Sequence, residues 1–274
     1  MTTERWDAGT GGWNVGFGLE ALPPVGLVEL EERASLQTRV DRKYVLPFDE
    51  VRRLLTVAGE GSRVLQIGDA RSFAYESVYF DTADLTSYLL TARRRRRRFK
   101  VRTRTYVDSE LCWLEVKTHA ARGLTVKNRL PYEPSHQSTL APGRWFVDRV
   151  LAETVLLRSE RLVFAPTLVT RYRRSTLYCP ATDSRLTIDL DLCWADHSRH
   201  QWLPGLAIVE TKTGSSASRF DRLLWARGHR PTRISKYATC LAALRPELPS
   251  TPWRRTLRRQ FLAAGSPAGH PISR

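Results

Sequence analysis

The chain has 274 residues and a strongly basic balance, with 44 Lys and Arg against 28 Asp and Glu, a formal net charge of +16 and a pI near 10.3. This excess predicts a polyanionic partner, such as nucleic acid, an acidic membrane or a phosphate-rich small molecule. The scattered cysteines disfavour a zinc site and indicate a reduced, cytoplasmic protein, and no run approaches the roughly 18 apolar residues of a membrane span.

Residues 1–20 and 249–274 have the composition of loosely ordered tails, rich in Gly, Pro and polar side chains. The basic charges of the second tail are interpreted as a solvated segment rather than a binding motif. Neither a long linker nor a repeat of fixed period divides residues 21–248, which are therefore expected to form one domain.

Inside this domain, eight segments alternate apolar and polar residues and are rich in β-branched and aromatic side chains, a pattern typical of strands. In chain order they are residues 39–46, 73–80, 99–106, 111–118, 124–130, 167–178, 185–192 and 206–213.

Helical signals lie between some of these strands, in residues 49–58, 143–157 and 217–227. Asp49 is a candidate N-cap for the first helix, Pro142 a starting residue for the second, and Gly228 a stop signal for the third. The expected class is α+β, mainly antiparallel sheet.

One face of each predicted strand is apolar and the other is charged, because residues i, i+2 and i+4 share a face. The charged positions are Arg102 and Arg104; Glu115 and Lys117; Lys127 and Arg129; Arg185, Asp189 and Asp191; and Glu210 and Lys212. A half-solvated sheet explains any single strand of this kind. The bias toward Lys and Arg and the repeated E-x-K spacing favour instead a closed eight-stranded β-barrel with helices packed outside, whose interior binds a chain of phosphates.

The stretch RRRRRRFKVRTRTY, residues 93–106, combines a block of charge with an alternation of charge. Consecutive arginines on a strand would put cations on both of its faces. We therefore expect Arg93 to Arg97 in a connection at the barrel rim. Arg98 is expected to begin a strand that directs Lys100, Arg102 and Arg104 inward.

Nine fragments of the chain, in the same order, resemble the polyphosphate polymerase domain of the vacuolar transporter chaperone (VTC) family, a branch of the triphosphate tunnel metalloenzymes. The fragments are RKYVLP, ESVYFDT, KVRTRTY, LEVKT, VKNRLPY, YRRSTL, RLTIDLDL, VETKTG and RISKY. The resemblance covers about residues 36–240 and implies a closed barrel whose basic tunnel binds ATP and the growing polyphosphate. It also implies Mn²⁺ or Mg²⁺ as the cofactor and no specific nucleic acid, and it leaves room for a membrane-protein partner.

The resemblance also implies roles for individual residues. The implied catalytic positions are Lys43, Arg102, Arg104, Lys117, Arg174 and Lys236. The substrate-binding positions, which combine the resemblance with the alternation, are Lys100, Lys127, Arg129, Arg185, Lys212 and Arg233. Glu210 matches the metal-binding glutamate, and Glu115 is either a second metal ligand or a salt-bridge partner of Lys117.

Several assignments stay open at this point. Arg173, next to Arg174, leaves that match uncertain by one residue. Asp189 and Asp191 either assist the metal or neutralise Arg185, whereas Asp81 is interpreted as structural.

The first strand reads R-V-D-R-K where tunnel hydrolases show E-x-E-x-K. This departure removes two metal-binding acids, and it favours a polymerase over the hydrolase and cyclase branches.

Phosphoryl transfer needs positioning and charge neutralisation more than covalent help, so cations plus a carboxylate-held divalent ion are a sufficient inventory. The expected function is an ATP-dependent polyphosphate polymerase that transfers the terminal phosphoryl group of ATP. The alternatives are a tunnel triphosphatase and a non-catalytic module that binds polyphosphate or nucleic acid through Arg93 to Arg98. The absence of an exposed aromatic row disfavours nucleic acid.

Overall fold

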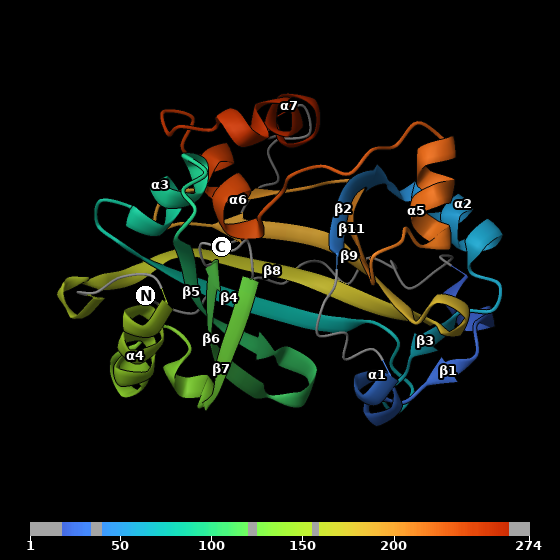
Figure 1. Ribbon diagram of the computed structural model, residues 1–274, viewed down its shortest axis with the longest axis horizontal. Helices are drawn as coiled ribbons and strands as arrows, with labels where there is room; N and C mark the ends of the chain where they lie inside the picture. The colour runs from blue at the N-terminus through green and yellow to red at the C-terminus, as the bar shows by residue number, and fades with distance from the viewer. Residues whose placement is uncertain (1–17, 34–39, 120–124, 155–158, 263–274) are drawn as a thin grey trace, which may run out of the picture.

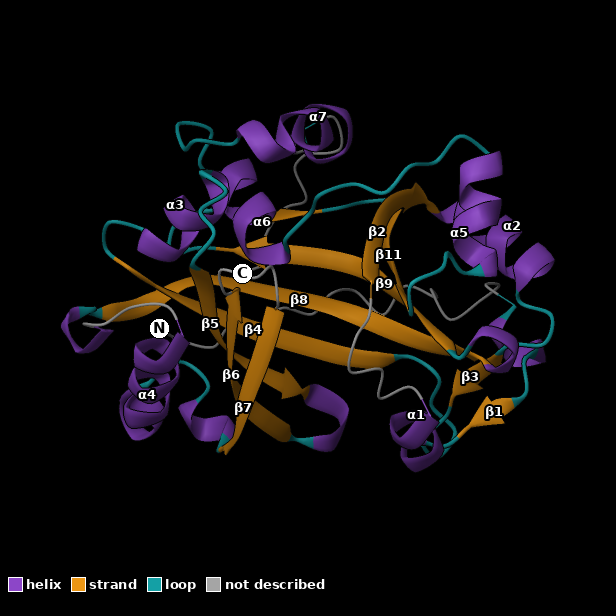
Figure 2. Ribbon diagram, viewed as in Figure 1, coloured by secondary structure: helices purple, strands orange, loops and turns teal. Residues whose placement is uncertain are grey.

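The computed structural model describes residues 18–33, 40–119, 125–154 and 159–262, and Figures 1 and 2 show one long twisted sheet with helices around it. Eight strands form a continuous antiparallel path in the order β2-β11-β9-β8-β4-β5-β6-β7. They are β2 (Val40–Pro47), β4 (Phe73–Thr82), β5 (Arg98–Tyr106), β6 (Leu111–His119), β7 (Thr125–Tyr132), β8 (Phe164–Cys179), β9 (Ser184–Ala195) and β11 (Leu206–Thr213). The eight strands expected from the sequence are confirmed, and three short ones extend the sheet, β1 (Pro24–Val25), β3 (Arg63–Leu65) and β10 (His200–Trp202).

The expected closure into a barrel is wrong, because the path ends at β2 and β7 and these two strands do not pair in the described ranges. Both edge strands carry lysine and proline, which hinder further pairing: Lys43 and Pro47 on β2, Lys127 and Pro131 on β7. The sheet is nevertheless strongly curled, since the charge of Lys43 acts on Lys117 of β6, near the opposite end of the path.

Helices lie on both sides of the curled sheet. They are α1 (Leu27–Arg33), α2 (Phe48–Ala58), α3 (Thr86–Ala92), α4 (Arg144–Thr154), α5 (Arg219–Ala226), α6 (Lys236–Leu244) and α7 (Arg254–Thr256). The three helices expected from the sequence are confirmed as α2, α4 and α5, although residues 155–157 lie outside the described part of the chain. Among the described helices, none is long and apolar enough to cross a membrane.

The ends of the helices test the expected capping residues. Gly228 follows the end of α5 with a φ of 81°, a left-handed conformation that glycine adopts without steric cost. The expectation for Asp49 is wrong, because β2 runs directly into α2 and Pro47 takes the N-cap position. Asp49 lies in the first turn instead, where it pairs with Arg52.

The outer face of the sheet is apolar and covered by helices. α2 and α5 pack on one half of it, around Tyr44, Ile188 and Val209. α4 packs on the other half, around Val101 and Leu114. The burial of these side chains removes apolar surface from water, which is the main favourable term in folding.

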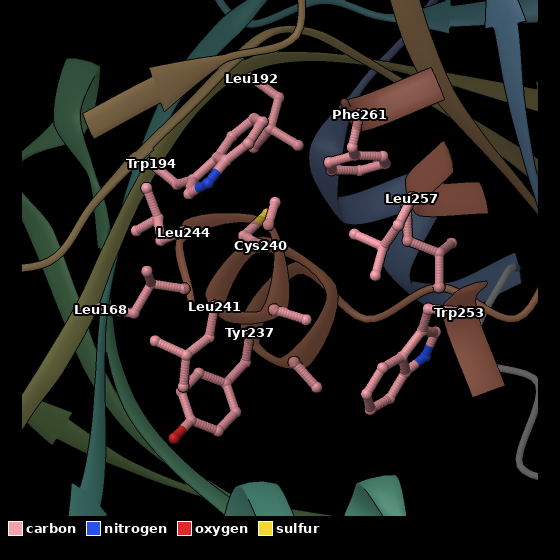
Figure 3. Packing of buried hydrophobic residues seen from close by; sticks show 14 of the residues in the cluster. Leu168, Leu192, Trp194, Tyr237, Cys240, Leu241, Leu244, Trp253, Leu257 and Phe261 are labelled. Carbon is pink, nitrogen blue, oxygen red and sulfur yellow. The ribbon is translucent and has the colours of Figure 1, made fainter. Parts of the chain in front are cut away.

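The expectation that every helix packs outside is wrong for α6, which lies against the inner face. Tyr237 and Leu241 of α6 pack with Leu168 and Trp194 of the sheet (Figure 3). All residues of α6 from Tyr237 to Leu244 are buried. A helix that is apolar all round is stable only when protein surrounds it, and the hollow of the curled sheet provides that environment.

The expectation of a loosely ordered tail from residue 249 onward is wrong for residues 251–261. Residues 251–261 form a helical segment, and its Trp253, Leu257 and Phe261 are buried in the same cluster as α6 (Figure 3). Their spacing of four residues places them on one side of the segment. The Pro and Arg content of this region hid that pattern, while residues 1–17 and 263–274 lie outside the described residues.

Asp81 joins β4 to α3 and α6, which confirms its structural interpretation. Its fully buried carboxylate accepts hydrogen bonds from the backbone N–H groups of Ser87, at 2.8 Å, and Tyr88, at 2.9 Å. The hydroxyl of Tyr237 on α6 donates to the same carboxylate at 2.5 Å. The Asp81 side chain therefore accepts hydrogen bonds from backbone N–H groups at the start of α3 and also holds α6 against the sheet.

Replacement of Asp81 by alanine is expected to lower the free energy of unfolding by about 3–5 kcal/mol, because three buried N–H groups, those of Thr82, Ser87 and Tyr88, and a phenol lose their acceptor. Tyr237→Phe removes only one of these bonds, so about 1 kcal/mol is expected. Urea unfolding followed by circular dichroism measures both. A loss for Asp81→Ala as small as that for Tyr237→Phe would contradict the joining role.

Candidate functional site

The inner face of the curled sheet collects the charged residues that the alternation singled out. Cross-strand partners point to the same side of a sheet, so the pairings define continuous rows. Four rows are Arg102–Glu115–Arg129, Lys100–Lys117–Lys127, Lys43–Glu210–Thr187 and Asp41–Lys212–Arg185. We call the strand cations on this side the inner cations; they are Lys43, Lys100, Arg102, Arg104, Lys117, Lys127, Arg129, Arg174, Arg185 and Lys212.

The sequence leaves the choice between Arg173 and Arg174 open, and two further predicted site residues, Lys236 and Arg233, lie outside the strands. Arg174 is the inward member of its pair, since it bonds to Asp189 whereas Arg173 donates to the carbonyl of Ser72 at 2.9 Å and is exposed. Lys236, the first residue of α6, also bonds to Asp189 and so reaches the inner face. Arg233 is exposed and lies at the border of the site rather than within it.

Asp189 holds two of the expected catalytic cations in place. Its carboxylate is fully buried and accepts hydrogen bonds from Arg174 at 2.5 and 2.8 Å, as well as one from Lys236. Burial alone would raise the pKa of Asp189, but the charges of Arg174 and Lys236 outweigh it and hold the pKa at about 2. This carboxylate therefore orients Arg174 and the start of α6, and it does not neutralise Arg185.

The structure gives Glu115 salt-bridge partners on both neighbouring strands. Its Oε2 accepts from the Nε of Arg102 at 2.8 Å, and its Oε1 lies 3.5 Å from the Nζ of Lys127. Both oxygens thus contact cations, as the salt-bridge role requires, and a metal-ligand role for Glu115 stays a prediction. Glu115 is a salt-bridge residue, but its partners are Arg102 and Lys127, not Lys117 on its own strand.

Glu210 is the other carboxylate expected to hold a divalent ion, and in the free protein its Oε1 accepts a hydrogen bond from the Nζ of Lys212. Among the described residues, no three His, Cys, Asp or Glu side chains lie together in a preformed metal site. Magnesium and manganese bound to phosphates need only one or two carboxylates, because phosphate oxygens and water complete the coordination. Burial would raise the pKa of Glu210, but the charges of Lys43 and Lys212 hold it well below its usual range, so this carboxylate is ionised.

Several inner lysines have lowered pKa values. Burial and the charge of Lys117 lower the pKa of Lys100 well below its usual range. Desolvation within the curled sheet and the charge of Lys43 lower the pKa of Lys117 to about 8, although part of its side chain is exposed to solvent. Burial is the largest cause of both shifts and neighbouring cations add to it, so an added anion would oppose them.

A layer of aromatic rings supports the inner arginines, and the sequence analysis missed it. The Arg102 guanidinium lies 5.7 Å from the ring centre of Tyr79, and that of Arg129 lies 4.6 Å from Trp113. Tyr75 lies beneath Arg104 and Arg174 at 5.6 and 5.3 Å. Cation–π contact and stacking hold the guanidinium planes in fixed orientations. The period-two pattern contained this signal, but these rings were assigned to the core or to strand ends.

One opening of the inner face lies where β5 begins and β6 ends, and we call it the mouth. A cavity of about 150 Å³ there is lined by Arg98, Lys100, Lys117 and His119, among others. The Nζ of Lys100 donates to the Oγ of Ser235, the N-cap residue of α6, at 2.8 Å. Arg93 to Arg97 are exposed in the connection before β5, and Arg98 begins that strand, as the sequence predicted.

Another cavity, of about 430 Å³, lies near the other ends of β6 and β7. None of the inner cations lines it. The mouth is therefore the cavity that belongs to the charged site.

Comparison with known proteins gives one family match, since a model of the VTC domain matches residues 38–245. Similar solved structures include a putative adenylyl cyclase, HpAC1, from Hippeastrum, described as having a dominant triphosphatase activity. Its identity is 15% and its TM-score 0.43, over 74% of this chain and 94% of that chain. The PH1819 protein of Pyrococcus horikoshii OT3 has 14% identity and a TM-score of 0.43, over 74% and 98%. No curated protein matches the chain significantly.

Binding of inorganic tripolyphosphate is expected to depend on the protonation of Lys117. With a pKa of about 8, Lys117 is charged at pH 7 and loses its charge as the pH rises to 9.5. Lys117→Arg keeps its charge throughout. The affinity of this variant relative to the wild type should therefore increase about tenfold between pH 7 and pH 9.5. Isothermal titration calorimetry measures this ratio, and a ratio independent of pH would exclude Lys117 from the anion site.

Proposed function

Because the chain belongs to the VTC domain family, we propose that it is an ATP-dependent polyphosphate polymerase. The proposed reaction transfers the terminal phosphoryl group of ATP to the end of a polyphosphate chain on the inner face and releases ADP. The observation that carries the proposal is the excess of cations over carboxylates on the inner face, where the row Lys100–Lys117–Lys127 contains no acid. A chain of phosphates supplies the missing counter-charge along the whole face.

An unsatisfied hydroxyl supports the same ligand chemistry. The hydroxyl of Tyr172 is buried and has no hydrogen-bond partner among the described residues. Burial would raise the pKa of Tyr172, but the charges of Arg104, Arg174 and Lys236 outweigh it and lower the pKa. A buried donor surrounded by cations requires an anionic acceptor, and a phosphate oxygen meets that need.

The inner cations divide into two sets with different roles. Arg102 and Arg174 are fixed by Glu115 and Asp189, so their remaining N–H groups are oriented before substrate arrives. Lys100 and Lys117 lie in a row without a carboxylate between them, so their ammonium groups bind phosphate oxygens directly. Fixed guanidinium groups set the position of the reacting phosphate, and the lysines neutralise its charge.

The bond changes need no nucleophile from the protein. An oxygen of the acceptor's terminal phosphate attacks the γ-phosphorus of ATP, and the bond from that phosphorus to the bridging oxygen breaks, so that ADP leaves. Negative charge accumulates on the leaving oxygen as the attacking oxygen loses it, and the inner cations stabilise the charge spread over the transferring group. Glu210 would hold a bound Mn²⁺ or Mg²⁺, which supplies additional neutralisation of the phosphates.

Incubation of the purified protein with ATP and Mn²⁺ is expected to yield ADP and a polymer that gel electrophoresis resolves. Glu210→Gln should abolish turnover, because it removes the charge that holds the divalent ion. The same variant should bind metal-free tripolyphosphate about as well as the wild type, because the inner cations remain. Release of inorganic phosphate without polymer would indicate a triphosphatase instead.

A salt series is expected to separate the arginines outside the site from those inside it. Exposed Arg94, Arg95 and Arg96 act through long-range attraction, which salt screens beyond about 8–10 Å at physiological ionic strength. Changing all three to Ser should lower kcat/KM about tenfold at low salt and little at high salt.

The comparison variant for this series is Arg104→Ser. Arg104 has no carboxylate partner in the described part of the chain, so its loss leaves no buried acid uncompensated, unlike the loss of Arg102. Losing its charge-assisted hydrogen bonds to phosphate should cost about ten- to a hundredfold in kcat/KM at every salt concentration. Equal, salt-independent losses in both variants would place the exposed arginines inside the site.

A further inference from the structure

A second group of arginines lies beside the mouth and has no role in the site described above. We call Arg254, Arg255, Arg258 and Arg259 the C-terminal arginines; all four are exposed on the helical segment whose other side is buried. We call Arg93 to Arg97 the rim arginines. Figure 1 shows α3, which leads into the rim arginines, together with α6 and α7 on the same side of the sheet.

Hydrogen bonds hold the C-terminal segment against the chain that borders the mouth. The hydroxyls of Thr256 and Thr232 lie 2.9 Å apart, and Gln260 donates to the carbonyl of Val45 at 3.1 Å. Next to Thr232 is Arg233, whose charge, together with partial burial, lowers the pKa of Arg98 in the mouth. The basic surface therefore continues from the mouth through Arg233 to the C-terminal arginines.

The rim arginines are attached to the same packed layer. Tyr88 of α3 donates to the carbonyl of Pro249 at 3.0 Å, and its ring centre lies 6.0 Å from that of Trp253. α3 ends at Ala92, directly before the rim arginines. Both groups of arginines thus adjoin two elements that pack on one another, α3 and the C-terminal segment.

Neither group has an acidic partner in the part of the chain that the structure describes. Some exposed arginines elsewhere differ in this respect, since Arg52 and Arg53 pair with acids in α2 and Arg227 pairs with Glu50. Unpaired like charges gathered on one surface repel one another, and a polyanion relieves that repulsion. The surface is therefore built for a ligand with many negative charges.

We infer that the rim arginines, Arg233 and the C-terminal arginines bind the part of a linear polyphosphate chain that extends outside the mouth. This inference rests on the proposed function, because it takes the chain elongated on the inner face as the ligand. A bilayer is disfavoured, since the C-terminal segment turns Trp253, Leu257 and Phe261 into the core and so lacks a side for insertion. Nucleic acid is disfavoured, because both aromatic rings of that segment are buried and unavailable for stacking.

The test compares long-chain polyphosphate with tripolyphosphate, using the full chain and a variant in which Arg254, Arg255, Arg258 and Arg259 are changed to Ser. At low salt, the Kd for the long chain should rise about tenfold, and the slope of log K against log salt should fall by about 2–3, or roughly 0.7 per lost phosphate contact. The Kd for tripolyphosphate should stay unchanged, because the inner face alone binds it. Fluorescence competition measures both ligands.

The matched control changes Arg52, Arg53, Arg149 and Arg173 to Ser, which removes the same charge from α2, α4 and the outer side of β8. It should alter neither Kd. Equal losses in the two variants would overturn the inference, because net charge alone would then explain them. Loss of binding to single-stranded RNA or to anionic vesicles, with polyphosphate binding intact, would also overturn it. If the wild type makes no polymer from ATP but the chain-length effect is observed, the surface stands and the proposed polymerase fails.

Discussion

Mutual repulsion among the inner cations is the constraint on which the rest of the structure depends. Lys100 and Lys117 are cross-strand partners on β5 and β6, and curling brings Lys43 of β2, near the other end of the path, close enough to lower their pKa values further. Such an arrangement is unfavourable in the free protein and has to be offset elsewhere. The apolar outer face, covered by α2, α4 and α5, provides that offset through burial of large side chains.

Carboxylates are used sparingly, and each one fixes a particular contact. Asp189 on β9 pairs with Arg174 of β8 and with Lys236 at the start of α6. Glu115 on β6 pairs with Arg102 of β5 and with Lys127 of β7. More acids on this face would neutralise the charge that binds phosphate, whereas fewer would leave the arginines without a defined orientation. The balance therefore serves two purposes, because it stabilises the curled sheet and prepares the site before substrate arrives.

The sequence allowed accurate prediction where local pattern determines structure. Alternation placed the strands and their charged faces, and it separated Arg97 from Arg98 at the start of β5. Local pattern could not show that α6 enters the curled sheet, because the apolar residues around Tyr237 read the same whichever surface covers them. The partners of Glu115 were likewise beyond the pattern, since they come from the register of β5 and β7 against β6. Polar composition concealed Trp253, Leu257 and Phe261, whose spacing identifies a packed segment.

The open edge of the sheet follows from the same charges that form the site. Pairing of β7 with β2 would place the inner residues Lys127 and Arg129 beside Lys43, and like charges opposite one another destabilise a ladder. The hydrogen bonds gained at that seam would be offset by the added repulsion, because each net bond contributes only about 1 kcal/mol. Because the sheet curls without closing, the inner cations surround a shared space while the basic edge strands β2 and β7 stay apart. Under the proposed function, the charges that would bind a polyanion on the inner face thus also hinder the sheet from completing its ring in the anion-free protein.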